Sequence, residues 1–219
     1  MRDLKFAAGE YYHVCGRGNN KQEIFHNDRD YIRFLAYLLC DQADTLVDID
    51  EVMERLGKNT ENLLDADVAE RIARDRYVEL VGFCLMPNHY HLILLNKNVE
   101  GISRYMQRTL NGYTRYSNVK YERVGHVFQG PFKAVRVESN EQLVYLSAYV
   151  HLNAKELPGW RDNPHQYPWS SYKDYLGGTT YQGLLKPEIV LGQFDKPSEY
   201  HRVTMQSGAK ELKLDHMLV

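Results

Sequence analysis

Two histidines separated by one residue stand where an apolar segment turns back on itself. The segment Gly82 to Leu95 reads GFCLMPNHYHLILL, with Pro87-Asn88 between two apolar runs and His89 and His91 opening the second run. Alternate side chains of a strand point to the same face, so both imidazoles face one way, with Cα atoms about 7 Å apart. That spacing lets both rings bind one cation. The alternative is an ordinary pair of hydrogen-bonded or solvent-facing histidines.

A predicted helix over residues 140–154 carries the other residues that could do chemistry. Tyr149 and Asn153 are four residues apart and therefore lie on one helix face. Two imidazoles with an amide oxygen suit Mg²⁺ or Mn²⁺ and leave positions open for phosphate oxygens, and a phenol beside such a phosphate can act as a nucleophile. Tyr145, one turn earlier on the same side, competes for the nucleophile's role. Asn153 has the alternative role of satisfying the last helix carbonyls.

The apolar pattern predicts a βαββαβ order followed by a helix. The expected strands are 10–17, 77–86, 89–96 and 131–137, and the expected helices begin at Asp28 (capped by Asn27), near Ile102 and at Asn140 (capped by Ser139 with Gln142). This order is that of an α+β, ferredoxin-like (RRM-like) fold, with a four-stranded sheet and helices on one face. The helix at 140–154 follows as a C-terminal catalytic helix.

Composition points to one globular domain with appendages. The chain has 219 residues, 43% of them apolar, and no apolar run near the roughly 20 residues that cross a bilayer. Met1-Arg2-Asp3 opens no signal peptide. Cys15, Cys40 and Cys84 lack CxxC spacing, so we expect reduced thiols in a cytoplasmic protein without a structural zinc site.

Charge is segregated along the chain, although the net charge is only −2. Residues 41–70 hold ten acidic and two basic residues, and residues 101–140 hold seven basic and two acidic ones. We interpret the first stretch as an acidic helical insertion that sits away from the basic side. The second favours nucleic-acid binding, with two solvated helix faces as the alternative.

Several separated motifs then resemble one family. They are the Asn88-His89-Tyr90-His91 segment, the Tyr149-Val150-His151-Leu152-Asn153 segment, Tyr12-His13-Val14 followed by Arg17-Gly18-Asn19-Asn20, the Gly125–Gly130 loop and Pro168-Trp169-Ser170-Ser171-Tyr172. Together they are similar to the single-tyrosine HUH transposases, and most similar to the REP-associated tyrosine transposases. The resemblance covers roughly residues 8–178. We therefore assign residues 1–178 to one domain and leave 179–219 as an extension of unknown role. Ala154 stands where the family has proline, so the helix is expected to run a turn further.

The resemblance implies a DNA strand transferase. In that family a Mg²⁺ or Mn²⁺ ion polarises the scissile phosphate, and tyrosine attacks single-stranded or hairpin DNA such as REP-like palindromes. Mapped here, His89, His91 and Asn153 are metal ligands, and Tyr149 forms the 5′-phosphotyrosine intermediate. No ATP is needed, which agrees with the absence of a P-loop sequence. Relatives act as homodimers that exchange tyrosines or as monomers.

Candidate DNA contacts lie in the loops and on the basic helix. They are Arg17, Asn19, Asn20, Arg104, Arg108, Arg115, His126, Gln129 and Lys133. Gly18-Asn19-Asn20 is equally good turn chemistry, and His126 and Gln129 could equally stabilise their loop. When bound to DNA, the protein would be nucleoid-associated.

Three other functions remain open on the sequence. One is a domesticated module that binds hairpin DNA without cleavage. A second is an RRM-like RNA-binding protein, although the strands lack the aromatic pattern of that class. A third is a zinc hydrolase, although HExxH is absent and no carboxylate lies near the histidine pair in the sequence.

Overall fold

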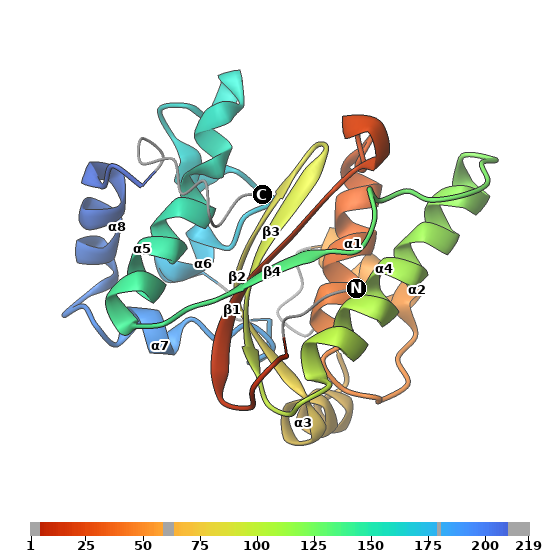
Figure 1. The fold of residues 1–219 in the computed structure, drawn as a ribbon, viewed down its shortest axis with the longest axis horizontal. Coiled ribbons are helices and arrows are strands. Elements are labelled where there is room, and N and C mark those ends of the chain that lie inside the picture. The colour runs from red at the N-terminus through yellow and green to blue at the C-terminus, as the bar shows by residue number, and fades with distance from the viewer. Residues whose placement is uncertain (1–4, 59–63, 179–180, 210–219) are drawn as a thin grey trace.

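Four antiparallel strands form one sheet in the order β2-β3-β1-β4, and helices cover both of its faces (Figure 1). The computed structural model describes residues 5–58, 64–178 and 181–209. The strands are β1 (Glu10–Arg17), β2 (Val78–Met86), β3 (His89–Asn96) and β4 (Lys133–Arg136). Along the chain, helix α1 follows β1 and precedes β2, and helix α4 follows β3 and precedes β4. The predicted α+β class and the predicted four-stranded sheet are therefore confirmed.

A two-residue turn joins the central hairpin and sets its register. Met86 pairs with His89 across the hairpin, so Pro87 and Asn88 alone connect β2 to β3. This is the tight antiparallel connection that the sequence predicts. A bulge between Leu80 and Gly82 shifts the register farther along the hairpin.

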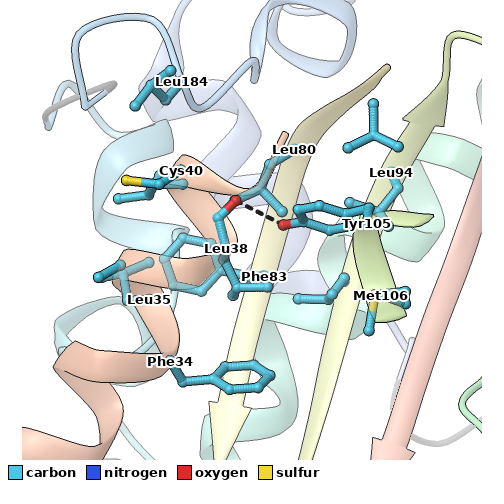
Figure 2. Close-up of a cluster of buried hydrophobic side chains, with 14 of the residues drawn as sticks. Phe34, Leu35, Leu38, Cys40, Leu80, Phe83, Leu94, Tyr105, Met106 and Leu184 are labelled. Carbon is cyan, nitrogen blue, oxygen red and sulfur yellow. Dashed lines mark hydrogen bonds between the residues drawn. The ribbon is translucent and has the colours of Figure 1, made fainter. Parts of the chain in front are cut away.

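Helices α1 (Asp28–Cys40) and α4 (Gly101–Lys120) cover one face of the sheet (Figure 1). Figure 2 shows the core between them and the strands, built by Phe34, Leu35, Leu38, Cys40, Leu80, Phe83, Leu94, Tyr105, Met106 and Leu184. Tyr105 is fully buried, and its hydroxyl donates a hydrogen bond of 2.7 Å to the Leu38 carbonyl. A buried phenol with a partner joins the two helices without leaving a polar group unsatisfied.

Helix α5 (Asn140–His151) covers the opposite face (Figure 1). Its start is as predicted, because the Ser139 hydroxyl accepts a 3.1 Å hydrogen bond from the Gln142 amide. The Gln142 side chain completes the cap one residue earlier than expected, by accepting from the Glu138 amide at 2.6 Å. After His151 the chain continues as a 3₁₀ turn, η2 (Leu152–Glu156). The extra turn expected from Ala154 is present in this tighter form.

His151 ties α5 to the end of the chain. It is fully buried; its Nδ1 lies 2.6 Å from the Tyr200 hydroxyl, and its Nε2 lies 2.8 Å from Ser171 Oγ. Burial lowers the pKa of His151 to about 3, so the ring is neutral at pH 7. Its two nitrogens therefore act as one donor and one acceptor between α5, the Ser171 loop and α8.

The C-terminal segment packs against the hydrophobic clusters on both faces of the sheet. It contains α6 (Tyr172–Tyr175), α7 (Glu188–Leu191) and α8 (Pro197–Gln206). Leu184 and Leu185 are buried with the α1 side, and Tyr200 is buried with α5. Within the predicted 179–219 extension, residues 179–180 and 210–219 lie outside the described residues. None of the described helices is long and apolar enough to cross a membrane.

The acidic segment is helical, as expected, but its predicted location is wrong. Its described part contains α2 (Ile49–Gly57) and the beginning of α3 (Ala66–Asp75), and residues 59–63 lie outside the described chain. Asp41 and Asp44 pair with Arg108 at 3.3 and 2.7 Å, and Asp44 also pairs with Arg104. The acidic segment thus contacts the basic helix α4 instead of sitting apart from it, because opposite charges attract across the α1–α4 interface.

The start of α1 shows a second correction. The helix begins at Asp28 as predicted, but the Asn27 side chain does not cap it. Asn27 Oδ1 instead accepts a 3.0 Å hydrogen bond from Lys120 Nζ on α4. Asp30, which is fully buried, accepts from Lys120 at 2.6 Å, from Tyr121 at 2.6 Å and from the His26 amide at 2.9 Å. Burial alone would raise the pKa of Asp30, but these donors outweigh it and hold the pKa below its usual range.

We expect Asp30→Asn to lower the free energy of unfolding by about 1–3 kcal/mol at pH 7, because the Lys120 ammonium loses its buried acceptor. The pKa of Asp30 is lower in the folded than in the unfolded chain. The stabilisation is therefore complete above about pH 4, the ordinary aspartate value, and disappears as pH falls through the lower folded value. Urea denaturation of both proteins from pH 2 to pH 7 measures the difference. Asp28→Asn, on the same helix but exposed, is the control and should cost less than about 1 kcal/mol; equal losses would contradict the assignment.

Candidate active site

One face of β1 and β3 carries the polar residues of the site, and α5 packs against it. Cys15 pairs with His91 across the two strands, and Arg17 pairs with His89. Side chains alternate along each strand, so His13 shares this face with them. The buried residues of this face, such as Ile93, pack with α5, whereas Tyr90 and Leu92 point into the core on the α1 side.

Tyr149 projects from α5 onto the histidines of the same chain. Its ring centroid lies 5.6 Å from that of His91 and 6.1 Å from that of His13, edge-on in both cases. The His89 and His91 centroids lie 5.1 Å apart. Burial raises the pKa of Tyr149, and the charge of Glu156 raises it further, so the free protein holds this group as a neutral phenol at pH 7. Tyr145 lies away from the histidines, with its hydroxyl 3.4 Å from the Gly208 carbonyl.

These side chains surround an open cavity of about 510 Å³. Its lining is Cys15, Gly16, Arg17, Lys21, His89, Tyr90, His91, Gln129, Pro131, Lys133, Tyr149, Asn153 and Glu156. Three basic side chains, two imidazoles, the Tyr149 phenol and one carboxylate therefore meet in one place. Such a cavity suits an anionic ligand that must also be activated.

Asn153 and Glu156 come from the 3₁₀ turn that follows α5. Asn153 is buried and donates its amide nitrogen to the carbonyls of Tyr149 at 2.9 Å and Val150 at 3.2 Å. The helix-end role that the sequence leaves open is thus present, and it orients the amide so that Oδ1 is the atom a cation could use. Glu156, missed by the sequence reasoning, is seven residues after Tyr149, which is two helical turns and hence the same side. The seven-residue spacing from Tyr149 could therefore have indicated Glu156 as a site residue.

A hydrogen bond determines which nitrogen of His89 carries the proton. Asn88 donates its amide nitrogen to the Lys21 carbonyl at 3.2 Å, so its oxygen must be the atom that faces His89 Nδ1 at 2.7 Å. An amide oxygen only accepts, and therefore His89 Nδ1 holds the proton and Nε2 holds the lone pair. Metal-binding histidines are oriented in this way by a second hydrogen bond.

His91 has an equivalent partner on the neighbouring strand. His13 Nε2 and His91 Nδ1 lie 2.9 Å apart, and the two rings are 1% and 4% exposed. When His91 Nδ1 donates the proton of this bond, its Nε2 lone pair is available to a cation. His13 belongs to the Tyr12-His13-Val14 motif of the sequence, but without knowledge of which strands are neighbours no role could be given to it.

The donor set fits a divalent cation. His89 and His91 are oriented to offer lone pairs, and the Asn153 amide and the Glu156 carboxylate bring oxygen atoms to the same cavity. Imidazole with amide and carboxylate oxygens is a set that Mn²⁺ and Mg²⁺ accept. The residues present are therefore compatible with the predicted cofactor.

The predicted DNA contacts outside α4 divide into three groups. Arg17, Gln129 and Lys133 line the cavity together with Lys21, which the sequence reasoning missed. Asn19 and His126 line a separate hollow of about 380 Å³ near the end of α4. Asn20 has a φ of 52°, a left-handed conformation that asparagine tolerates, which supports the turn interpretation of this residue.

The three arginines of α4 are not near the cavity. Helix α4 covers the face of the sheet opposite the histidines (Figure 1). Arg104 and Arg108 pair with Asp41 and Asp44, and Arg115 lines a groove on the outer surface of α1 and α4. The structure therefore does not bring these arginines together with the other predicted site residues.

Comparisons with known proteins agree with this architecture. Residues 58–153 match the sequence model of a family described as "Transposase IS200 like". A solved structure of a REP-associated tyrosine transposase bound to a REP hairpin superposes with a TM-score of 0.52 and 13% sequence identity, covering 81% of this chain and 84% of that one. At that identity the likeness shows a shared fold. No curated protein matches the chain. The family resemblance seen in the motifs is thus confirmed by the match over 58–153.

The orientation of His89 by Asn88 can be tested by metal binding alone. Asn88→Ala removes the acceptor for His89 Nδ1, and we expect Mn²⁺ to bind about 10- to 100-fold more weakly in a titration followed by electron paramagnetic resonance. Asn88→Asp keeps an acceptor oxygen and should bind within a few-fold of the unchanged protein. Equal affinities for the alanine variant and the unchanged protein would contradict the assigned proton position.

Proposed function

Because the chain carries the signature of the IS200-like transposases over residues 58–153 and folds like a REP-associated tyrosine transposase, we propose that it cleaves and rejoins DNA strands in transposition. The substrate is single-stranded or hairpin DNA. The observation that carries the proposal is the packing of Tyr149 against His91 in a cavity that is also lined by basic residues.

The proposed reaction needs a nucleophile, a proton acceptor and a charged cradle for phosphate. Tyr149 Oη attacks the scissile phosphorus and forms a P–O bond, while the bond from phosphorus to the 3′ oxygen breaks. The phenol proton passes to the Glu156 carboxylate, and the departing 3′ oxygen takes a proton from water. The DNA remains attached through a 5′-phosphotyrosine link, which preserves the energy for rejoining. In rejoining, a 3′ hydroxyl attacks the link and Tyr149 recovers its proton.

The metal ligands are proposed to be His89, His91 and Asn153. When bound there, Mg²⁺ or Mn²⁺ supplies positive charge to the phosphate oxygens. The chain itself orients the two imidazoles through Asn88 and His13 before any ligand arrives. Such preorganisation reduces the cost of arranging the site at the moment of reaction.

The proposed site is complete within one chain. Tyr149 and the two histidines belong to the same subunit, so a monomer could act without exchanging tyrosines. The RRM-like alternative is disfavoured, because α5 and the C-terminal segment cover the sheet face that such a module would leave open (Figure 1). A hairpin-binding module without cleavage is the outcome that the following experiments would reveal.

Labelled hairpin DNA incubated with the protein and Mn²⁺ should give a protein–DNA adduct that survives denaturation. We expect Tyr149→Phe to reduce adduct formation by about 10³-fold or more, since the phenylalanine ring has no hydroxyl to form the link. Tyr145→Phe, a phenol on the same helix outside the cavity, is the matched control and should retain it. An adduct with Tyr149→Phe would refute the assignment, whereas salt-sensitive binding without any adduct would favour the binding module.

Binding to DNA should depend on salt through the basic residues of the cavity and not through those of α4. Each of Arg17→Ala and Lys133→Ala should decrease the slope of log affinity against log salt by about 0.7 for single-stranded DNA. Arg104→Ala should leave the slope unchanged, because Arg104 pairs with Asp44 on the opposite face. Fluorescence anisotropy between low and moderate salt measures these slopes. A steeper effect of Arg104 than of Lys133 would place the DNA on α4 instead.

A further inference from the structure

A thiol lies among the histidines and has no part in the proposed reaction. Cys15 on β1 is directly opposite His91 on β3, and His13 is two residues before it on the same strand face. One nitrogen from each of His13 and His91 and the Cys15 sulfur all lie within 4.8 Å of one another. Cys15 is half-buried and lines the cavity, so a dissolved ion can reach it.

The three atoms are near enough to one another to bind a single zinc ion after small movements. Zinc bonds of about 2.0–2.1 Å to nitrogen and 2.3 Å to sulfur place neighbouring ligand atoms about 3.3–3.6 Å apart. His13 Nε2 and His91 Nδ1 already face each other at 2.9 Å, with ring planes within 9° of parallel. Small outward shifts of these rings would make room for an ion in place of the shared proton.

The chemistry of the donors selects a different ion from the one that cleavage uses. A thiolate with two imidazoles favours Zn²⁺ and other soft or borderline ions, whereas Mg²⁺ and Mn²⁺ prefer sites rich in oxygen. The cluster on β1 and β3 and the proposed cleavage site therefore differ in specificity. They share one residue, His91.

We propose that His13, Cys15 and His91 form a second metal site that takes Zn²⁺ and thereby switches off the neighbouring cleavage site. The ion binds His13 Nε2, Cys15 Sγ and His91 Nδ1, with water from the cavity as the fourth ligand. Cys15 releases its proton to solvent, and the His91 proton moves from Nδ1 to Nε2. A protonated Nε2 has no lone pair, so His91 can no longer bind the ion that cleavage requires.

Cobalt provides a direct test of the metal site that needs no DNA. With the reduced protein, one equivalent of Co²⁺ should produce a thiolate-to-cobalt charge-transfer band and the intense visible bands of tetrahedral coordination. Cys15→Ala should abolish the charge-transfer band. Cys40→Ala, which removes a buried thiol on the other face of the sheet, and His89→Ala should retain it. Failure of the band to appear in the unchanged protein, its persistence in Cys15→Ala or its loss in His89→Ala would overturn the site.

The regulatory effect rests on the proposed function and is measured separately. Zn²⁺ added to the Mn²⁺-dependent adduct assay should inhibit it, with each variant compared with its own zinc-free level. Cys15→Ala should raise the half-inhibitory Zn²⁺ concentration at least about tenfold, and Cys40→Ala should not change it. Equal inhibition of Cys15→Ala and the unchanged protein would overturn the switch. If no protein forms an adduct even without zinc, the proposed function fails, while the cobalt spectra still decide the metal site.

Discussion

The antiparallel register between β1 and β3 is the constraint on which the site depends. It places Cys15 opposite His91 and Arg17 opposite His89, so four side chains with chemistry share one sheet face. A slip of one residue would turn that set into the apolar core beneath α1 and α4. The turn at Pro87-Asn88 holds the register, because the Asn88 carbonyl accepts a 2.8 Å hydrogen bond from the Gly18 amide and thereby ties the hairpin to the end of β1. One short turn therefore sets both the strand pairing and the proton position of His89.

Acidic and basic residues that are far apart in the sequence form ion pairs in the fold. The basic helix α4 and the acidic segment are separated along the chain, yet Arg104 and Arg108 neutralise Asp41 and Asp44 on the surface away from the cavity. The basic side chains that line the cavity are Arg17, Lys21 and Lys133. An almost neutral protein can therefore present a locally positive site to a polyanion.

Local periodicity predicted much of the architecture and part of the site. The period of two placed His89 and His91 on one strand face, and the period of 3.6 placed Tyr149 and Asn153 on one helix face. These relations lie within β3, or between α5 and the 3₁₀ turn that continues it, and need no tertiary information. His13 and Asn88 act through partners on other strands or loops, and the location of Arg104 and Arg108 depends on which helix the acidic segment meets. Such long-range neighbours are set by packing of the whole chain, and a single sequence does not encode them in any local pattern.

The contacts of His151 have a mechanical consequence. This ring is two residues beyond Tyr149 on the same helix, and through Tyr200 and Ser171 it joins α5 to the segments that follow. Tyr200 also donates a 3.1 Å hydrogen bond to Ser147 one turn earlier, so hydrogen bonds to Tyr200 hold α5 at two points along its length. Helix α5, which carries Tyr149, is therefore held in place by hydrogen bonds within its own chain. If α5 moved toward another subunit, α8 would have to move with it or these hydrogen bonds would have to break.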